Sequence, residues 1–281
     1  MSKSKYPRWK PDESPKPWRN IKQEEFASAK SKKEQVTDYR KEFLSKFRSL
    51  TYSRGPFDVW SDFVTVSACA ISNVFDKSNF ADREKAYLRT IEKYRKPEQL
   101  LFSELLALMT LSLEKNPEQD FLGAMFMELN LGNLHSGQVF TPYHIGQLMA
   151  DVVLDDIVSE VKAKGYITVH DSCCGSGTLL ISSANTIKAQ LCKEGMNYQN
   201  HLFVVAQDID QTVAQMCYIQ LSLLGIAGFV KVGNSLTNPV MPGDSNENYW
   251  FTPMYFSNVW YTRRMMAAFK NLMEGLDNEK V

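Results

Sequence analysis

Three short runs of β-branched and aromatic residues, separated by segments of helical periodicity, constrain the fold of this chain most strongly. The runs span residues 166–170, 202–206 and 229–232. Such runs are typical of strands in a buried parallel sheet. A helix that opens at Ser176 separates the first two runs, and a helix that stops at Gly225 separates the last two. This alternation predicts an α/β fold with a doubly wound, parallel sheet and right-handed crossovers.

A polar residue follows each predicted strand. These residues are Asp171, Asp208 and Asn234. Ligands of open α/β sheets bind beyond the carboxyl ends of the strands. We therefore expect these three side chains to border one ligand site.

The chain before residue 134 has a different pattern, with only two glycines between Lys41 and Leu131. Its apolar residues recur every three or four positions, as in Phe43, Phe47 and Leu50; Val59, Phe63 and Val66; and Leu101, Leu105, Leu108 and Leu111. This spacing predicts amphipathic helices. We expect a helical domain over residues 35–133 and an α/β domain over residues 134–281.

Basic charge is concentrated near the amino end. Residues 1–48 contain 14 Lys or Arg and 7 Asp or Glu, a net charge of +7 in a chain that is neutral as a whole. Prolines interrupt this segment before any apolar period begins, at Pro7, Pro11, Pro15 and Pro17. The pattern predicts a basic, disordered tail over residues 1–34. Both a solubilising leader and an arm that binds a polyanion fit such a tail.

Several classes of protein are excluded. The best apolar stretch, residues 59–72, is too short to cross a bilayer and is broken by Asp62, so we expect no membrane partner. The five cysteines form no C-x-x-C pair, which argues against a disulfide scaffold and against a zinc site. We therefore expect no metal and a reducing, cytoplasmic location.

The segment D-S-C-C-G-S-G-T, residues 171–178, joins the first strand to the next helix. Gly175 and Gly177 allow a ligand to approach the backbone, and the free N–H groups of a helix start favour an anionic group. Tight packing alone would also explain two glycines here. No Gly-Lys-Ser/Thr follows, which argues against a nucleotide P-loop.

Asp208 ends the second strand, where an acidic side chain can accept hydrogen bonds from both hydroxyls of a ribose. Ile209 follows directly and offers an apolar surface to one face of an adenine ring. The alternative role of Asp208 is to cap the helix that starts at Asp210.

A third motif, G-Q-V-F-T-P, occupies residues 137–142. Thr141 as N-cap and Pro142 at the first helical position predict a helix over residues 143–154. Its apolar stripe consists of Ile145, Leu148, Met149 and Val152.

Together, G-Q-V-F-T-P, D-S-C-C-G-S-G-T-L-L-I and Q-D-I-D resemble, in order and spacing, the motifs of type I restriction-modification system modification (M) subunits and related adenine-N6 DNA methyltransferases. The resemblance covers roughly residues 40–236. It implies a partial Rossmann-like methyltransferase sheet within residues 134–281 and S-adenosylmethionine as cofactor. The residues that it assigns to the cofactor are Gln138, Phe140, Thr141 and Pro142 at the methionine end; Asp171, Cys173, Gly175 and Gly177 at the amino-acid group; Asp208 at the ribose; and Ile209 and Asn234 at the adenine.

Catalysis in the resembled family depends on an Asn/Asp-Pro-Pro-Tyr/Phe motif after the fourth strand. The exocyclic amine of adenine is a weak nucleophile, so its protons need acceptors while the flipped-out ring stacks on an aromatic side chain. The nearest match is T-P-M-Y, which makes Thr252, Pro253 and Tyr255 the candidate catalytic residues.

Two other interpretations of this region remain open. Asn238-Pro239 keeps two letters of the motif but follows Asn234 too closely to leave room for a fourth strand. The T-P-M-Y segment also suits a structural turn within an aromatic cluster of Tyr249, Trp250, Phe251, Tyr255, Phe256 and Trp260.

Two main functions follow from the resemblance. The first is adenine-N6 methylation of double-stranded DNA, bound weakly by this chain alone because no basic groove is visible after residue 48. The second is a catalytically inactive, S-adenosylmethionine-binding homologue that serves as a regulatory or assembly subunit and needs a partner. Methylation of a small molecule or a protein fits the pocket but leaves the helical segment unexplained.

The number of residues after Trp260 bears on both proposed functions, because it limits how many strands the sheet can have. Only 21 residues follow Trp260, which is too few for the last three strands of a complete methyltransferase of this kind. We therefore expect a C-terminally short sheet with an open edge and an apolar face. The N-terminal helices, a second copy of the chain or another subunit would cover them.

Overall fold

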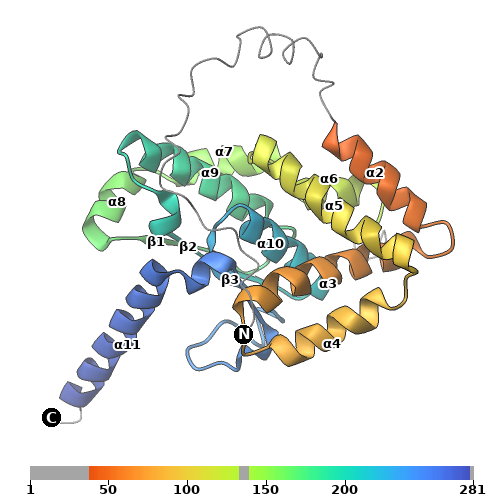
Figure 1. Cartoon of the computed structure of the whole chain (residues 1–281). Helices are drawn as coiled ribbons and strands as arrows, with labels where there is room; N and C mark the ends of the chain where they lie inside the picture. Colours follow the sequence, from red (N-terminus) through yellow and green to blue (C-terminus); the bar gives the residue numbers. More distant parts are fainter. Residues whose placement is uncertain (1–37, 133–138, 279–281) are drawn as a thin grey trace, which may run out of the picture. The chain divides into compact units, whose positions relative to one another are not determined.

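The computed structural model describes residues 38–132 and 139–278, with the side chains of residues 271–278 left out of the description. The residues from Tyr39 onward form one unit by their mutual contacts (Figure 1). The predicted basic tail, residues 1–34, and the candidate cofactor residue Gln138 lie outside the described residues.

The amino-terminal part of this unit is helical, as its periodicity predicts. It consists of α2 (Tyr39–Leu50), α3 (Pro56–Phe75), α4 (Phe80–Ile91), α5 (Lys96–Lys115) and α6 (Phe121–Glu128). Aromatic rings fill its core, where Phe43 packs edge-on against Trp60, Phe63 and Phe121. Such aromatic pairs stabilise the fold beyond the contribution from burying the rings themselves.

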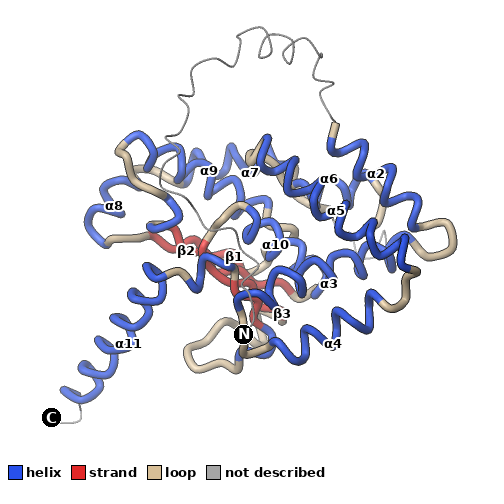
Figure 2. Tube along the Cα trace, viewed as in Figure 1, coloured by secondary structure: helices blue, strands red, loops and turns tan. Residues whose placement is uncertain are grey.

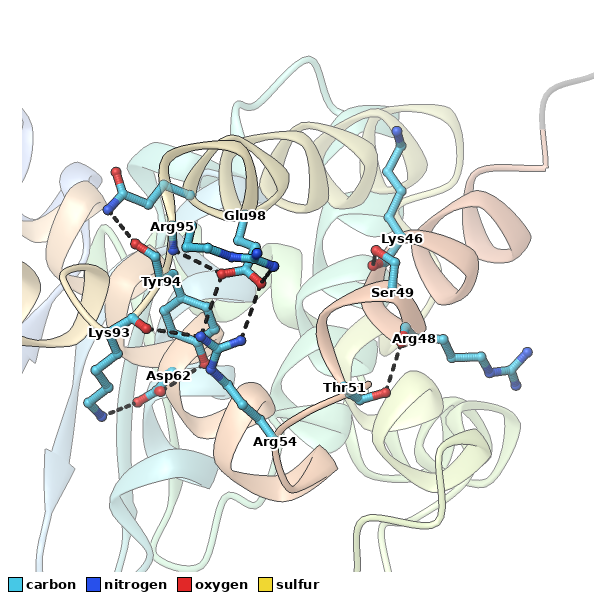
Figure 3. A network of polar contacts seen from close by, with 11 residues as sticks. Lys46, Arg48, Ser49, Thr51, Arg54, Asp62, Lys93, Tyr94, Arg95 and Glu98 are labelled. Atoms are coloured by element: carbon cyan, nitrogen blue, oxygen red, sulfur yellow. Dashed lines mark hydrogen bonds and ion pairs between the residues drawn. The ribbon is translucent and has the colours of Figure 1, made fainter.

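A polar network fixes the turn between α4 and α5 onto α3 (Figure 3). Asp62 of α3 accepts hydrogen bonds from Lys93 Nζ at 2.8 Å and from Tyr94 Oη at 2.9 Å. Glu98 forms ion pairs with Arg54 at 3.4 Å and with Arg95 at 3.0 Å. The carboxylates of Asp62 on α3 and Glu98 on α5 thus hold the connecting segments before α3 and after α4.

The helices continue into the core of the α/β part. Trp60 of α3 is fully buried, and its indole N–H donates to the sulfur of Met216, at 3.4 Å. One continuous cluster of buried apolar residues runs from Phe43 to Trp250. The division into domains at residues 133 and 134 stays a prediction.

The sheet has four strands, β1 (Ile167–Asp171), β2 (Leu202–Asp208), β3 (Ala227–Val232) and β4 (Tyr249–Phe251). Their order in the sheet is β1-β2-β3-β4. Figure 2 shows the strands in red among the helices. The first three are parallel, with Asp171 opposite Ala206 and Asp208 opposite Val232. The sequence therefore predicted the α/β class and these three strands correctly.

The prediction of a doubly wound, entirely parallel sheet was wrong for the described strands. Their order follows the chain without reversal, and β4 runs antiparallel to β3. A loop rather than a helix joins these two strands, so the chain returns in the opposite direction. The ammonium of Lys231 holds this loop through Asn238, the carbonyl of Pro239, and Asp244.

The helices α9 (Thr178–Lys193) and α10 (Gln211–Leu223) pack on one face of the sheet. On that side, Leu202, Val204 and Ala206 of β2 are buried. The side chains between them, such as Phe203 and Val205, are only partly buried, and Thr168 on β1 is exposed. The sheet therefore has one well-covered face and one more open face, as the sequence predicted.

Two further helices lie before β1, α7 (Tyr143–Val153) and α8 (Ile157–Lys164). The N-cap of α7 is Pro142, without a side-chain cap, so the prediction of Thr141 as N-cap was wrong. The expected apolar stripe is largely exposed, because α7 packs on α9 through Gly146 and Ala150 instead. A Cβ at Gly146 would lie 3.0 Å from Ser182 Oγ, so glycine suits the close approach of the two helices there.

Short 3-10 helices span Tyr198–Asn200, Asn246–Asn248 and Pro253–Phe256, and the last helix, α11, spans Asn258–Asn278. Trp260 anchors the start of α11, and its indole N–H donates to the carbonyl of Gln199 at 2.8 Å. Beyond this anchor α11 projects away from the sheet (Figure 1). Among the described residues, no helix combines the length and the apolar character needed to cross a bilayer.

Candidate functional site

The carboxylate of Asp208 joins two loops at the carboxyl ends of the strands. Its Oδ2 accepts a hydrogen bond from the backbone N–H of Gly175 at 2.9 Å, and its Oδ1 accepts one from the N–H of Asp210 at 3.0 Å. The N–H of Cys174 donates to the carbonyl of Gln207 at 2.9 Å. The loop after β1 and the end of β2 therefore lie side by side, as the sequence predicted.

The glycines of the first loop have conformations that suit no other residue well. Gly175 and Gly177 have φ angles of +56° and +102°, in the left-handed region. A Cβ at Gly177 would lie 3.0 Å from Cys217 Sγ on α10. Gly177 is also the N-cap of α9 and has no side chain, so it offers the first N–H groups of α9 no side-chain acceptor.

The segment before α7 reaches the same loop through Phe140. A Cβ built on Gly175 would lie 3.5 Å from Cδ1 of Phe140. The ring of Phe140 packs on Phe126 of α6, with centroids 5.2 Å apart. Thr141 and Pro142 are exposed beside it.

A residue that the sequence analysis missed, Asp120, fixes the start of α9. Its Oδ2 accepts hydrogen bonds from the hydroxyls of Ser176 and Thr178, and its Oδ1 accepts from the N–H of Gly123 and the amide of Gln220. Asp120 is the N-cap of α6 and is buried. An aspartate directly before an apolar helix was the available signal, but it indicates only a cap.

Two carboxylates give the site a negative charge. Burial raises the pKa of Asp171, a hydrogen bond from the N–H of Cys173 lowers it, and the charge of Asp208 raises it further. The net result is a pKa above the ordinary value for aspartate. A cation placed between these carboxylates would favour their ionised form.

The remaining predicted residues border the same region. Ile209 follows Asp208, and 68% of its surface is exposed. Asn234 follows β3, and its Oδ1 accepts hydrogen bonds from the N–H groups of Leu236 and Thr237 at 2.9 and 3.3 Å. Cys173 is exposed, with its sulfur 3.9 Å from the hydroxyl of Ser235. The loops after β1 and β3 are thus close to each other.

The candidate catalytic residues lie at the opposite end of the sheet. Thr252 is fully buried, and its hydroxyl accepts from the N–H of Gly228 at 3.0 Å and donates to the carbonyl of Gly228. Gly228 is near the amino end of β3, whereas Asn234 follows the carboxyl end. The prediction that Thr252, Pro253 and Tyr255 act on a base at the cofactor site is therefore wrong, because the antiparallel β4 carries them away from it.

The ring contacts support the alternative interpretation of this segment, except that Trp250 packs on Tyr218 instead, with ring centroids 5.4 Å apart. Tyr255 packs on Phe251, with ring centroids 4.5 Å apart, and the guanidinium of Arg264 lies 3.6 Å from the centroid of its ring. Phe251 also contacts Tyr249 and Phe256. The T-P-M-Y segment is a structural turn in an aromatic cluster.

The second candidate for the catalytic motif, Asn238-Pro239, lies closer to the carboxyl ends of the parallel strands than T-P-M-Y does. The carbonyl of Asn238 accepts from Gln207 Nε2 at 2.8 Å, and its side-chain oxygen accepts from Lys231 Nζ at 3.0 Å. Through these two hydrogen bonds Asn238 holds the loop between β3 and β4.

Comparison with known proteins agrees with this arrangement of motifs. The family model described as N-6 DNA Methylase matches residues 120–280, more than half of the chain. The chain therefore belongs to the N-6 DNA methylase family. The match begins at Asp120 and includes the glycine loop, Asp208 and Asn234.

Other similarities are shorter. CD81 antigen from Homo sapiens and from Pan troglodytes is 34% identical to this chain over 86 residues, and CD81 antigen from Chlorocebus aethiops is 33% identical over 86 residues. Each alignment covers 30% of this chain and 35% of the relative, so the chain spans about a third of the length of these relatives. No solved structure matches the chain.

Proposed function

We propose that this chain is a DNA methyltransferase-like protein that binds S-adenosylmethionine at the carboxyl ends of β1, β2 and β3. The convergence of Asp208, Gly175 and Phe140, which come from three separate segments, is the observation that supports the proposal most. In this family the cofactor supplies the activated methyl group for transfer to N6 of adenine.

The charge of the site fits this cofactor. S-adenosylmethionine carries a positive sulfonium and a positive amino group, and Asp171 and Asp208 provide two neighbouring carboxylates. The raised pKa of Asp171 means that ionising this carboxyl without a nearby cation costs free energy. A cationic ligand would offset that cost.

The other polar groups can be assigned to parts of the cofactor. The carboxylate of its amino-acid group suits the N–H groups at the start of α9, after Gly177. Asp208 would accept from the ribose hydroxyls, while Ile209 would cover a face of the adenine. Because Oδ1 of Asn234 already accepts two backbone hydrogen bonds, its amide nitrogen is the group left to donate to an adenine ring nitrogen.

Methyl transfer needs groups beyond the cofactor site. Acceptors for the amine protons and an aromatic surface must face the methyl group, and the T-P-M-Y segment lies at the other end of the sheet. We therefore favour a cofactor-binding subunit that methylates adenine only together with a partner chain, as a relative of restriction-modification subunits. The packing of the Tyr255 ring on Phe203 and Phe251 supports this choice over an enzyme acting alone.

Isothermal titration with S-adenosylmethionine tests the cofactor site. Asp208→Ala removes the ribose acceptor, and Gly175→Val introduces a side chain at a positive φ, close to Phe140. Both changes should weaken binding at least tenfold. Asp82→Ala, at an exposed aspartate on α4, is the matched control and should leave the affinity unchanged. Equal affinity in all four proteins would disprove the assignment.

Transfer of a labelled methyl group to unmethylated DNA tests the need for a partner. The purified chain should bind the cofactor but transfer no label above background, and transfer should appear when co-purified chains from its native host are added. Transfer by the purified chain alone, lost in Asp208→Ala, would instead establish an independent enzyme.

A further inference from the structure

One face of α2 is basic and open to solvent. Its exposed residues recur every three or four positions and are Lys41, Ser45, Arg48 and, in the turn after the helix, Tyr52. The ring of Tyr52 stands well clear of the core, since 92% of this residue is exposed. This surface, which we call the α2 face, therefore presents two cations, a hydroxyl and an aromatic ring to solvent.

The α2 face is concave rather than flat. Its four residues line a hollow of about 550 Å³, together with Leu44, Ser49 and Glu128. Glu128 is the last residue of α6 and is exposed. The two cations thus converge on one hollow, which has a single carboxylate among its lining residues.

The charge of Arg48 is left available for an anion. None of the ion pairs between described residues involves Arg48. Figure 3 shows its side chain extending away from the polar network around Glu98. Lys46 on the same helix differs, because it forms an ion pair with Glu104 of α5 at 2.8 Å. The cation that faces α5 is therefore neutralised within the fold, whereas the cation on the α2 face is not.

The helix α6 connects this hollow to the proposed cofactor site. Its N-cap, Asp120, accepts hydrogen bonds from the hydroxyls of Ser176 and Thr178 at the start of α9. Its other end, Glu128, lines the hollow. The eight residues of α6 span about 12 Å at 1.5 Å per residue, which is about the width of the major groove of DNA. A duplex held at the hollow would therefore lie about one groove width from the start of α9.

We propose that the α2 face binds the sugar-phosphate backbone of duplex DNA beside the cofactor site. Arginine, lysine, serine and tyrosine side chains are among the groups that contact phosphate and sugar in complexes with DNA. The choice of DNA among polyanions rests on the proposed function, in which an adenine in DNA receives the methyl group. The cofactor site itself carries the carboxylates of Asp171 and Asp208, which repel phosphate. The α2 face thus provides affinity for DNA that the cofactor site does not.

Fluorescence anisotropy with a short labelled duplex tests the assignment in the full chain. Arg48→Ala should weaken binding about five- to tenfold at about 0.1 M salt, because each neutralised phosphate adds about −0.9 to the slope of log affinity against log salt concentration. That slope should become less steep by about 0.9. Arg89→Ala, at an exposed arginine on α4, is the matched control and should change neither quantity. Equal effects of the two changes would indicate attraction by net charge alone and disprove the site.

Two further measurements test the hollow and the form of DNA that it binds. Glu128→Gln removes the carboxylate from the hollow and should tighten binding about twofold; an unchanged or weaker affinity would contradict the proposal. In Arg48→Ala, a duplex of unrelated sequence should lose affinity by the same factor, because phosphate contacts carry no sequence information. A single strand that binds more tightly than the duplex, with a preference lost in Tyr52→Ala, would indicate stacking on unpaired bases and overturn the proposal.

Titration with S-adenosylmethionine separates this proposal from the proposed function. Arg48→Ala should bind the cofactor as the wild type does, and Asp208→Ala should not weaken the binding of DNA. A wild-type chain that binds the cofactor but no DNA would disprove the α2 face alone. A wild-type chain that binds no cofactor, but whose affinity for DNA still falls in Arg48→Ala, would disprove the cofactor site and leave the α2 face established.

Discussion

The backbone N–H of Gly175 donates to the carboxylate of Asp208 at 2.9 Å, although 33 positions separate them in the chain. This hydrogen bond joins the glycine loop to the end of β2 and sets the spacing between the two groups that the cofactor would contact. Asp208 also accepts from the N–H of Asp210, but it does not cap α10 as the alternative role required, because the N-cap of that helix is Asp210, which accepts from the N–H of Val213. The carboxylate is thus already oriented before a ligand binds.

We predict that Asp120→Ala destabilises the fold and weakens the cofactor site. The carboxylate accepts four hydrogen bonds from three segments, and its removal leaves buried donors without acceptors. Each such donor costs about 1–3 kcal/mol, so we expect the free energy of unfolding to fall by about 3 kcal/mol or more. Urea denaturation measures this change. A loss below about 1 kcal/mol would contradict the role given to Asp120.

We predict that affinity for S-adenosylmethionine falls as the pH is lowered through the raised pKa of Asp171. A bound cation favours the ionised carboxylate, so protonation of the free protein competes with binding. The decline should begin at a higher pH than for an ordinary aspartate. Titrations between pH 4 and 7 should show it in the wild type. The Asp171→Asn variant should bind S-adenosylmethionine more weakly at neutral pH, and its affinity should depend less on pH. If the variant keeps the pH profile of the wild type, Asp171 is not the group that causes the pH dependence.

Thr252→Val should destabilise the protein without altering cofactor binding. The hydroxyl pairs with both the N–H and the carbonyl of Gly228 in the interior, and valine has nearly the same shape without it. The expected loss is about 1–3 kcal/mol by thermal or urea unfolding. Thr252→Ser, which keeps the hydroxyl, should recover part of it. Should Thr252→Val keep full stability but abolish methyl transfer by an assembled complex, the original catalytic interpretation would have to be restored.

The ion pair between Lys231 and Asp244 should contribute to acid sensitivity. The hydrogen bond from Lys231, followed by that from Tyr249, holds the pKa of Asp244 at about 2, below its ordinary value. Because the folded-state pKa is depressed, this stabilisation is present above about pH 4 and is lost as the pH falls toward 2. Asp244→Asn should therefore lower the melting temperature at pH 7, with a smaller difference from the wild type near pH 2. A constant difference across this range would contradict the assignment.

The local elements of the fold were predictable because each depends on short-range patterns. Short runs of β-branched and aromatic residues predicted β1, β2 and β3, and the helical periodicity predicted α3 and α5. The direction of β4 was not predictable in this way. It depends on the loop that Lys231 fixes through Asp244, and these two residues meet only in the folded chain.

In the candidate site, too, some features follow from the local sequence and others from contacts between distant segments. The left-handed glycines, Gly175 and Gly177, and the acidic residue at the end of β2 are local features, and the sequence located them. The start of α7 was misplaced by one residue, and its apolar stripe is exposed, since the close packing of Gly146 on α9 decides which face is buried. Hydrophobic periodicity points to the helix face with the larger apolar side chains, but in α7 the buried face is the one that carries Gly146 and Ala150.

The sequence by itself determined the α/β class, the order of the first three strands along the chain and the residues that line their carboxyl ends. Only the tertiary structure decided that T-P-M-Y is far from those residues, that Asp120 fixes the glycine loop, and that α11 projects with its apolar face exposed. Strand ends and tight turns follow from steric preferences within a few residues. The position of Thr252 beside Gly228 depends instead on pairing between distant segments, which is decided by packing and hydrogen bonding across the whole fold.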